Sequence, residues 1–360
     1  MEVVSAAGIE YPVFVADDEA ATEHLAPLIA GRALLLVSDE NVAPLHLGPV
    51  CAVFAAAARI ETLVLPVGEA EKSLAGFQRI LDRLVAGGFH RDAIVVALGG
   101  GVVSDLAGFA AACYQRGVGW IVVPTTLLAQ ADASLGGKTA VNHARGKNLI
   151  GAFHDPLAVW IAPARLATLP AREYRAGLGE VVKYGLGFDA DFFAWLEANA
   201  AALLTREAVA LDYAIPRCVK LKLDVVAADR TEQGRRALLN LGHTIGHALE
   251  TVLGHGTWPH GEAVAVGLVA AVELSAARGA LASDIPARLR RLLQAFELPT
   301  TIPPEVLDAA LFAALALDKK IIADRLRFIG FDGLGHAKIW SDVEPEEITR
   351  AIAAAREKTC

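Results

Sequence analysis

Short apolar runs alternate with amphipathic stretches over roughly the first 155 residues. Four runs predict buried strands that end in polar or glycine-containing turns: RALLLVSDEN (32–41), IETLVLPVGEAEKS (60–73), AIVVALGGG (93–101) and GWIVVPTTLL (119–128). Between them, LAGFQRILDRLVAGG (74–88) has the apolar spacing of an amphipathic helix that ends at glycine. Apolar strands separated by helices predict an α/β region with a parallel sheet that is covered on both faces.

From about residue 160 the strand pattern gives way to helical periodicity. Five stretches carry it: AREYRAGLGEVVKYGLG, FDADFFAWLEANAAALL, AIPRCVKLKLDVVAADR, HGEAVAVGLVAAVELSAARG and IPARLRRLLQAF. A pair of short strands is expected within 325–340. We place the boundary within 151–170 and assign 1–158 to the α/β domain and 159–360 to a mainly α-helical domain.

Length and composition agree with two globular domains. The chain has 360 residues, and a domain typically takes roughly 150. Hydrophobic residues make up 54%, yet no uninterrupted apolar run reaches the roughly 18 residues that a membrane span needs. The N-terminus lacks the basic segment of a secretory signal. Four scattered cysteines, Cys51, Cys113, Cys218 and Cys360, fit reduced thiols, so the expected compartment is the cytoplasm.

The net charge of −8 argues against nucleic acid or an anionic membrane as a partner. It is compatible with a small anionic substrate, because salt screens charges over about 8 Å and a local group of Lys and Arg then outweighs a distant acidic surface.

A glycine-rich segment follows the third predicted strand. In ALGGGVVSDLAGFAA (97–111), glycines before a helix let backbone N–H groups approach a pyrophosphate. Ser104 and Asp105 are placed to cap that helix or to contact a ribose; the alternative is a tight left-handed turn with Asp as the helix cap. Acids in VSDEN (37–41) and PVGEAEKS (66–73) suit a ribose, with capped turns as the alternative.

Glycine-flanked lysines follow in ASLGGKTAVNHARGKNLIGAFHDP (133–156). Lys138, Lys147 and Asn148 supply donors suited to phosphate or carboxylate oxygens. The segment is not a Walker A motif, because residue 132 is Asp and not Gly. The alternative is a solvated basic loop.

Two later stretches carry metal-ligand chemistry. In LGEVVKYGL (178–186), Glu180 and Lys183 share one face of a partly apolar helix, and a buried carboxylate needs a partner or a metal. The stretch 238–264, LLNLGHTIGHALETVLGHGTWPHGEAV, holds four of the ten histidines. His243 and His247 are spaced i, i+4 on one helical face.

The spacing alone leaves the ligand set open. HExxH is absent because Thr244 takes the Glu position, and His260 is expected at a helix N-terminus. His243 and His247 with either His255 or His260 would suit zinc, and two His with one Glu would complete a catalytic zinc site. Core or capping histidines are the alternative.

Several long segments together resemble the 3-dehydroquinate synthase family of sugar-phosphate cyclases, which is related in fold to iron-type alcohol and glycerol dehydrogenases. They are GGGVVSDLAGF, PTTLLAQADASLGGKTAVNHARGKNLIGAFHDP, GLGEVVKYGL, LLNLGHTIGHALE, HGTWPHGEAV and LDKK, within about residues 36–330. The resemblance implies an N-terminal Rossmann-like domain that binds NAD, a helical C-terminal domain that binds Zn²⁺ or Co²⁺, and an active site between them.

The implied reaction converts 3-deoxy-D-arabino-heptulosonate 7-phosphate into 3-dehydroquinate and phosphate. Transient oxidation by NAD acidifies the neighbouring C–H, so phosphate leaves by β-elimination; reduction and an intramolecular aldol closure follow. The alternatives are a sibling cyclase acting on sedoheptulose 7-phosphate or glucose 6-phosphate, an iron-type dehydrogenase, or a non-catalytic nucleotide-binding protein. Lys222 with Arg236 favours a substrate that carries a carboxylate.

The resemblance also implies residue roles. The metal ligands would be Glu180, His243 and His260, with His247 facing the substrate. The catalytic group would be Lys138, Glu232, Arg236, Asn240 and His247. Further substrate contacts would be Arg116, Asp132, Lys147, Asn148, Lys183, Lys222 and one of Lys319 and Lys320, with Arg116 reaching across a homodimer interface. The NAD contacts would be Asp39, Asn41, Glu69, Lys72, Gly101, Val102, Val103, Ser104, Asp105, Thr125, Thr126, Lys138, Lys147 and Thr168. Ser104 stands where the family has glycine, so the turn is expected to accommodate a Cβ.

Overall fold

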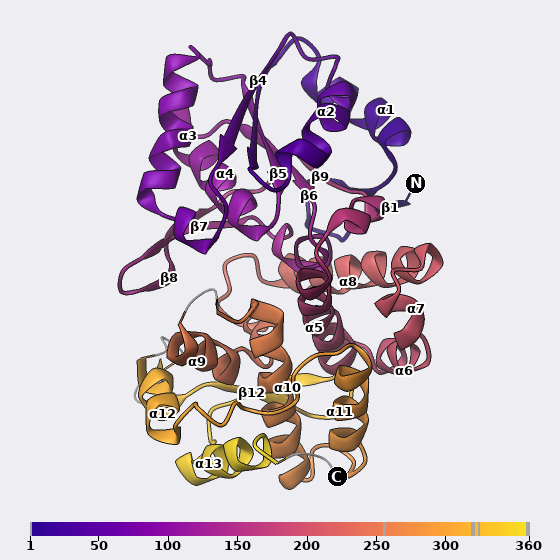
Figure 1. Ribbon diagram of the computed structural model, residues 1–360, viewed down its shortest axis with the longest axis vertical. Coiled ribbons are helices and arrows are strands. Elements are labelled where there is room, and N and C mark those ends of the chain that lie inside the picture. The colour runs from indigo at the N-terminus through magenta and orange to yellow at the C-terminus, as the bar shows by residue number, and fades with distance from the viewer. Residues whose placement is uncertain (1, 255–256, 318–320, 323–324, 358–360) are drawn as a thin grey trace. The chain divides into compact units, whose positions relative to one another are not determined.

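The computed structural model describes residues 2–357 apart from 255–256, 318–320 and 323–324. The chain forms two compact units (Figure 1). Unit 1 comprises residues 1–170 and 211–231, and unit 2 comprises 171–210 and 232–360. These units differ from the two consecutive blocks expected from the sequence, because 211–231 belongs to unit 1. Helical periodicity identifies such a segment as a helix but not the core against which it packs.

Unit 1 is built on a seven-stranded sheet with the order β1-β2-β9-β6-β5-β3-β4. Its strands are β1 (Glu2–Val4), β2 (Val13–Val15), β3 (Ala33–Asp39), β4 (Arg59–Leu65), β5 (Ile94–Gly99), β6 (Gly119–Pro124) and β9 (Ala158–Ile161). All neighbouring pairs are parallel except β1–β2 at one edge. The predicted parallel sheet and its four predicted strands are confirmed; the antiparallel β1–β2 edge was not predicted.

Helices cover both faces of this sheet (Figure 1). On one face, α1 (Asp18–Ile29) and α2 (Ala43–Val53) bury Leu25 and Val50 against Leu34, Leu36 and alternate residues of the neighbouring strands. On the other face lie α3 (Leu74–Ala86) and α4 (Gly101–Cys113). Alternate strand residues point to opposite faces, and both sets are apolar, so the sheet is buried on both sides.

Further elements complete unit 1. They are η1 (Glu69–Glu71), η2 (Tyr114–Arg116), the π-helical turn η3 (Ala129–Ala133), η4 (Pro163–Thr168) and most of α8 (Ala208–Ala228). The lysine-rich segment 138–148 belongs to an antiparallel hairpin of β7 (Lys138–His143) and β8 (Gly146–Phe153). The alternative of a solvated basic loop was wrong, because alternating residues such as Thr139 and Val141 are buried while Lys138 is exposed.

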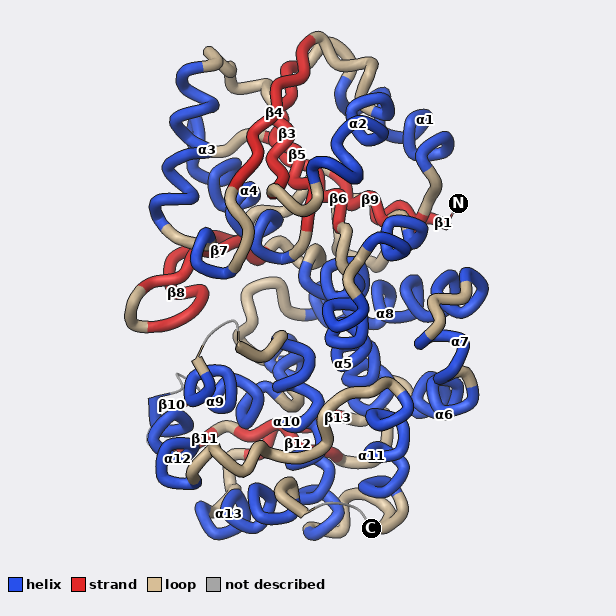
Figure 2. Tube along the Cα trace, viewed as in Figure 1, coloured by secondary structure: helices blue, strands red, loops and turns tan. Residues whose placement is uncertain are grey.

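Unit 2 is mainly helical (Figure 2). Its helices are α5 (Ala171–Phe188), α6 (Ala190–Ala198), α7 (Ala200–Leu204), η5 (Arg235–Asn240), α9 (His243–Leu253), α10 (His260–Ala277), α11 (Ile285–Ala295), α12 (Asp308–Leu317) and α13 (Pro345–Ala354). The predicted strand pair is confirmed as β12 (Phe328–Phe331) and β13 (Ala337–Trp340), and β10 (Ile321–Ile322) pairs with β11 (Arg325–Leu326).

Helix α10 is the core helix of unit 2. By length and composition it would pass for a membrane span, but 72% of it is buried inside the protein. It packs against α5, α9, α11 and α13. A helix that is apolar on all sides is expected at such a position in a protein core.

Candidate metal and nucleotide sites

Two of the helices that carry metal-ligand candidates touch backbone to backbone. A Cβ added at Gly261 of α10 would lie 1.8 Å from the carbonyl oxygen of Ala176 in α5, and one added at Gly179 would lie 2.4 Å from the Gly261 carbonyl oxygen. Gly179 precedes Glu180, and Gly261 follows His260. The absence of side chains at these two glycines therefore lets α5 and α10 bring Glu180 and His260 together.

The third helix approaches α10 in the same way. A Cβ at Gly267 would lie 1.9 Å from the carbonyl oxygen of Gly242. Gly242 is the N-cap of α9, has a left-handed backbone conformation with φ 79°, and directly precedes His243. Each of the three ligand candidates thus has a neighbouring glycine at a close contact between helices.

Glu180 lies between two histidines. Its Oε1 is 3.5 Å from Nε2 of His243 and 3.3 Å from Nε2 of His260, and its side chain is fully buried. Its Oε2 forms an ion pair of 2.6 Å with Nζ of Lys183, which is buried as well. An i, i+3 pair of this kind usually lies on the protein surface, but the helix face that carries Glu180 and Lys183 is inside unit 2.

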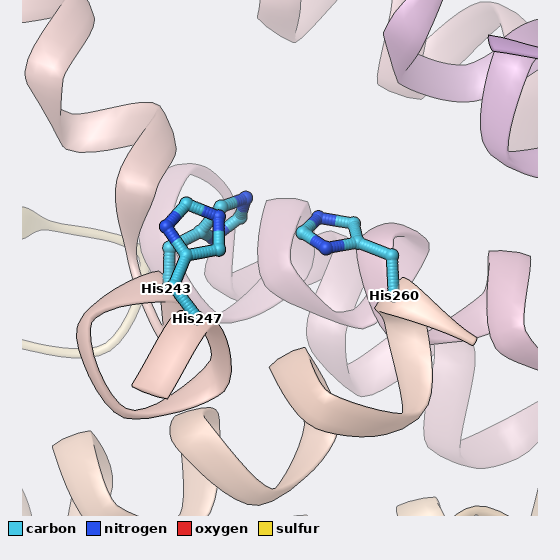
Figure 3. Close-up of side chains that lie close together, drawn as sticks. All are labelled: His243, His247 and His260. Atoms are coloured by element: carbon cyan, nitrogen blue, oxygen red, sulfur yellow. The ribbon is translucent and has the colours of Figure 1, made fainter. Parts of the chain in front are cut away.

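The three imidazoles form one cluster (Figure 3). His243 and His247 project from α9 towards His260 in the first turn of α10. Their ligand nitrogens lie within 4.8 Å of one another. The prediction that His243 and His247 share one helical face is confirmed, and so is the position of His260 at a helix N-terminus. His255 lies outside the described residues.

The second nitrogen of two of these histidines is also held. Nδ1 of His243 lies 3.0 Å from the carbonyl oxygen of Leu241. Nδ1 of His260 lies 3.1 Å from Oε2 of Glu250, a buried residue of α9. Burial alone would lower the pKa of His260, but the hydrogen bonds to Glu180 and Glu250 raise it to about 9. A cation that binds Nε2 has to displace the proton there.

Other predicted residues of unit 2 lie near the start of α9. Asn240 donates a hydrogen bond of 2.8 Å from Nδ2 to Oε1 of Glu232. Glu232 has a φ of 60°, a conformation that costs a non-glycine residue free energy and is concentrated at functional sites. Arg236 is almost completely buried in η5. Lys319 and Lys320 lie outside the described residues.

In unit 1, residues 101–105 form the first turn of α4 and not a free glycine turn. Gly100 is the N-cap, and no side chain among the described residues caps this helix. Ser104 donates its N–H to the carbonyl oxygen of Gly100, so its Cβ sits in ordinary helical geometry. The Cβ of Ser104 is accommodated, as expected, whereas the alternative of an Asp cap on a left-handed turn was wrong.

Two buried hydroxyls follow the carboxyl ends of β5 and β6, namely Ser104 Oγ and Thr125 Oγ1. Neither has a hydrogen-bond partner among the described residues. A Cβ added at Gly101 would make only an ordinary contact of 3.7 Å with Ala133, so packing does not require glycine there. These features suit a cofactor that contains a pyrophosphate. The helix N-terminus is open, the two hydroxyls can still form hydrogen bonds, and the glycine leaves space for close approach of the backbone.

Acidic and basic side chains near the carboxyl ends of these strands are held by hydrogen bonds and an ion pair. Oδ1 of Asp39 accepts hydrogen bonds of 2.9 Å from the backbone N–H groups of Asn41 and Val42, which makes it a turn cap, as the alternative interpretation had it. Lys72 pairs with Asp105. Burial raises the pKa of Asp105, and Lys72 acts against this rise.

Further predicted residues of unit 1 make defined contacts. Glu69 accepts a 2.7 Å hydrogen bond from Asn142, whose Oδ1 accepts the N–H of Asn148. Lys222 Nζ donates to the backbone oxygen of Asp132 at 2.8 Å and also pairs with its carboxylate. Thr126 caps the turn before Ala129 with its hydroxyl, and Thr168 contacts Nε2 of His46 at 2.8 Å.

Sequence reasoning missed Glu250 and the close glycine contacts. Glu250 follows His243 by seven residues on α9, a spacing that returns to the same helical face. That spacing could have predicted that the Glu250 carboxylate lies near the histidines. The glycine contacts join residues that are far apart in sequence, and nothing local marks them.

Known structures share this fold. A 2-epi-5-epi-valiolone synthase from Streptomyces hygroscopicus subsp. jinggangensis, with NAD⁺ and Zn²⁺ bound, superposes with a TM-score of 0.89 at 30% identity over 99% of both chains. A 2-deoxy-scyllo-inosose synthase complexed with carbaglucose-6-phosphate, NAD⁺ and Co²⁺ has a TM-score of 0.88 at 27% identity over 98% of both. Fold and site thus define the class of sugar-phosphate cyclases.

Sequence comparison narrows this class. Residues 62–176 match the family 3-dehydroquinate synthase N-terminal, and 177–321 match 3-dehydroquinate synthase C-terminal. A 3-dehydroquinate synthase of Shewanella frigidimarina is 47% identical over 344 residues, 95% of this chain and 96% of the relative. The chain belongs to the 3-dehydroquinate synthase family.

Proposed function

We propose that Glu180, His243 and His260 hold a divalent metal, Zn²⁺ or Co²⁺, in an NAD-dependent enzyme that converts 3-deoxy-D-arabino-heptulosonate 7-phosphate into 3-dehydroquinate and phosphate. One observation carries the metal site: Oε1 of Glu180 lies 3.5 and 3.3 Å from Nε2 of the two histidines. The reaction is redox-neutral overall, since the hydroxyl oxidised before the loss of phosphate is regenerated before ring closure.

The donor set fits such a metal. Two imidazoles and one carboxylate are a common ligand set of catalytic zinc sites, which leave a position open for substrate. The Nδ1 atoms of His243 and His260 face Leu241 and Glu250, which leaves the Nε2 atoms towards Glu180. When bound, the metal would polarise the reacting hydroxyl, and NAD would accept and return a hydride.

We propose that NAD binds at the carboxyl ends of the parallel strands in unit 1. The first turn of α4 supports this, because its N–H groups have no side-chain cap among the described residues, and the hydroxyls of Ser104 and Thr125 are buried without a hydrogen-bond partner there. The full proposed set is Asp39, Asn41, Glu69, Lys72, Gly101, Val102, Val103, Ser104, Asp105, Thr125, Thr126, Lys138, Lys147 and Thr168.

For the anionic substrate we propose residues that hold its phosphate and carboxylate. Lys222 is buried and oriented by Asp132, and an ammonium group fixed in this way loses little further freedom when it binds an anion. Asn148 keeps a φ of 54° and is held through Asn142. The full proposed set is Asp132, Lys138, Lys147, Asn148, Lys183, Lys222, Glu232, Arg236, Asn240, His247 and one of Lys319 and Lys320.

We further propose a cytoplasmic homodimer in which Arg116 reaches the active site of the partner subunit. Support comes from the backbone: Gln115, Arg116 and Gly117 have φ values of 51°, 67° and 119° in succession. Two consecutive non-glycine residues in this region store strain, which is typical of functional positions. Arg116 is exposed, as a contact with a partner subunit requires. The free thiols of Cys51, Cys113 and Cys218 support the cytoplasmic location. Sedimentation at assay concentration tests the dimer, and a monomer that is fully active contradicts it.

The decisive assay follows inorganic phosphate and the absorbance of NADH together. Purified protein with NAD, Zn²⁺ and the heptulosonate phosphate should release phosphate without accumulating NADH. An iron-type dehydrogenase would accumulate NADH in proportion to product. A sibling cyclase would release no phosphate from the heptulosonate phosphate. It would instead turn over sedoheptulose 7-phosphate or glucose 6-phosphate.

A further inference from the structure

A buried carboxylate stands behind one of the proposed metal ligands. Glu250 is 4% exposed, although ionised carboxylates are rarely buried without a partner of defined geometry. Its Oε2 lies 3.1 Å from Nδ1 of His260. None of the roles given to the other site residues accounts for this contact.

His243 and His260 are arranged alike but anchored differently. Each directs Nε2 towards Oε1 of Glu180 and Nδ1 towards an oxygen acceptor. The acceptor is the backbone carbonyl of Leu241 for His243 and the Glu250 carboxylate for His260. A backbone carbonyl follows from the fold of α9 itself, whereas the carboxylate is a side chain that substitution can remove.

We propose that Glu250 is a positioning residue for the metal centre: it holds the proton of His260 on Nδ1 and the ring in one orientation, so that the Nε2 lone pair faces the metal. The inference rests on the proposed metal site. A carboxylate that accepts from the distal ring nitrogen fixes the tautomer and makes the histidine a better donor, and loss of such partners typically lowers metal affinity about 10- to 100-fold.

Two helices give this contact its specificity. Glu250 belongs to α9 and His260 to the first turn of α10, which pack closely through Gly242 and Gly267. The contact therefore links the helix that supplies His243 to the side chain supplied by α10. A change at Glu250 should disturb one ligand and leave His243 and its backbone anchor in place.

The test uses Glu250→Gln and Glu250→Leu in the full chain. Affinity for Zn²⁺ is measured by competition with a chromophoric chelator, and the visible absorption bands of the Co²⁺-loaded protein report ligand geometry. Gln keeps the shape and a weaker acceptor, so we expect about tenfold weaker metal binding; Leu keeps the bulk without an acceptor, so we expect about 100-fold. The Co²⁺ bands should shift in both variants.

Glu273→Gln is the matched control. Glu273 lies on α10, pairs with Arg290, and is remote from the histidines in sequence. Its metal affinity and Co²⁺ spectrum should equal those of the wild type. NAD affinity and the thermal unfolding midpoint are measured for every variant, so that loss of folding is recognised independently of metal binding.

The outcomes separate the two proposals. If the wild-type chain binds no stoichiometric Zn²⁺, the metal site itself fails. If the wild type binds Zn²⁺ and a folded Glu250 variant has unchanged affinity and an unchanged Co²⁺ spectrum, the positioning role is overturned while the metal site stands. Should Leu prevent folding, the Gln variant decides by the same two readouts.

Discussion

The two candidate sites are built in different ways. In unit 1 the residues come largely from short segments near the ends of neighbouring parallel strands, and some of these segments are held by their own contacts, as where Asp39 caps the turn that follows its own strand. In unit 2 the ligand candidates come from three helices, and their convergence depends on contacts such as Gly261 against Ala176. Local turns and a helix N-terminus contribute to the first site, whereas the second depends on close packing between helices.

This difference predicts how each site responds to change. A substitution in unit 1 should alter one contact and leave the sheet intact, because the edge is supported by a core on both faces. A substitution at a helix contact in unit 2 should change folding and ligand geometry together, since packed interiors tolerate little added volume.

The largest effect is expected from His260→Ala. It removes one of three proposed ligands, so Zn²⁺ affinity should fall by more than the roughly 100-fold that loss of an outer partner causes. Turnover should be abolished, whereas NAD affinity in unit 1 should stay near the wild-type value. Zinc content after dialysis and a fluorescence titration with NAD measure the two quantities. Unchanged turnover in metal-free buffer would remove His260 from the metal site.

A pair of glycine substitutions tests the comparison directly. Gly261→Ala would place a Cβ 1.8 Å from the Ala176 carbonyl oxygen and force α5 and α10 apart, so the free energy of unfolding should drop by about 3 kcal/mol and zinc affinity should fall with it. Gly101→Ala meets only an ordinary contact, so its unfolding free energy should change by less than about 0.5 kcal/mol.

The effect on NAD binding should come from the substitution in unit 1. Gly101→Ala should weaken NAD binding about tenfold, which corresponds to about 1.4 kcal/mol, because its Cβ occupies the space the backbone leaves for the pyrophosphate. Urea unfolding and NAD titration of both proteins give the four values. If Gly261→Ala were as stable as the wild type, close helix contacts would not determine the ligand geometry.

Local encoding explains what could be predicted from the sequence. The strands, the helices and the shared face of His243 and His247 follow from periodicities of two and 3.6 residues within one segment. Glu180 was assigned to the metal only through resemblance to a family, because its partners lie on other helices. Gly179 and Gly261 carry no side chain that a pattern could register, and Ser104 was expected in a turn because glycines before a helix do not mark where the helix begins.

A smaller effect is expected from Arg236→Ala. The guanidinium is almost completely buried, and removal of such a group from an ionic contact typically costs about 2 kcal/mol or more, so KM for the heptulosonate phosphate should rise about 30-fold or more. NAD affinity should change by less than about twofold, since the residue belongs to unit 2. Arg235→Ala, the exposed neighbour, is the control. Equal losses for substrate and NAD would move Arg236 out of the substrate group.

The smallest effect is expected from Lys72→Met in unit 1. Lys72 is the cation beside Asp105, whose pKa is raised above its ordinary value of 3.8 by burial, and loss of Lys72 should raise that pKa further. The folded state then binds the proton of Asp105 more tightly than the unfolded chain does. The unfolding free energy of the variant should therefore fall as pH rises from about 4 towards the folded pKa and stay level above it.

The loss at pH 7 should be about 1 kcal/mol, because Asp105 can take up a proton instead of remaining charged without Lys72. Urea unfolding at several pH values between about 4 and 8 measures it, with Lys220→Met as the control, since Lys220 and Asp224 form an exposed pair. Zinc affinity should be unchanged, because the substitution alters one local contact in unit 1. If the Lys72→Met variant lost zinc affinity as well as stability, the proposed independence of the nucleotide site in unit 1 from the metal site in unit 2 would be wrong.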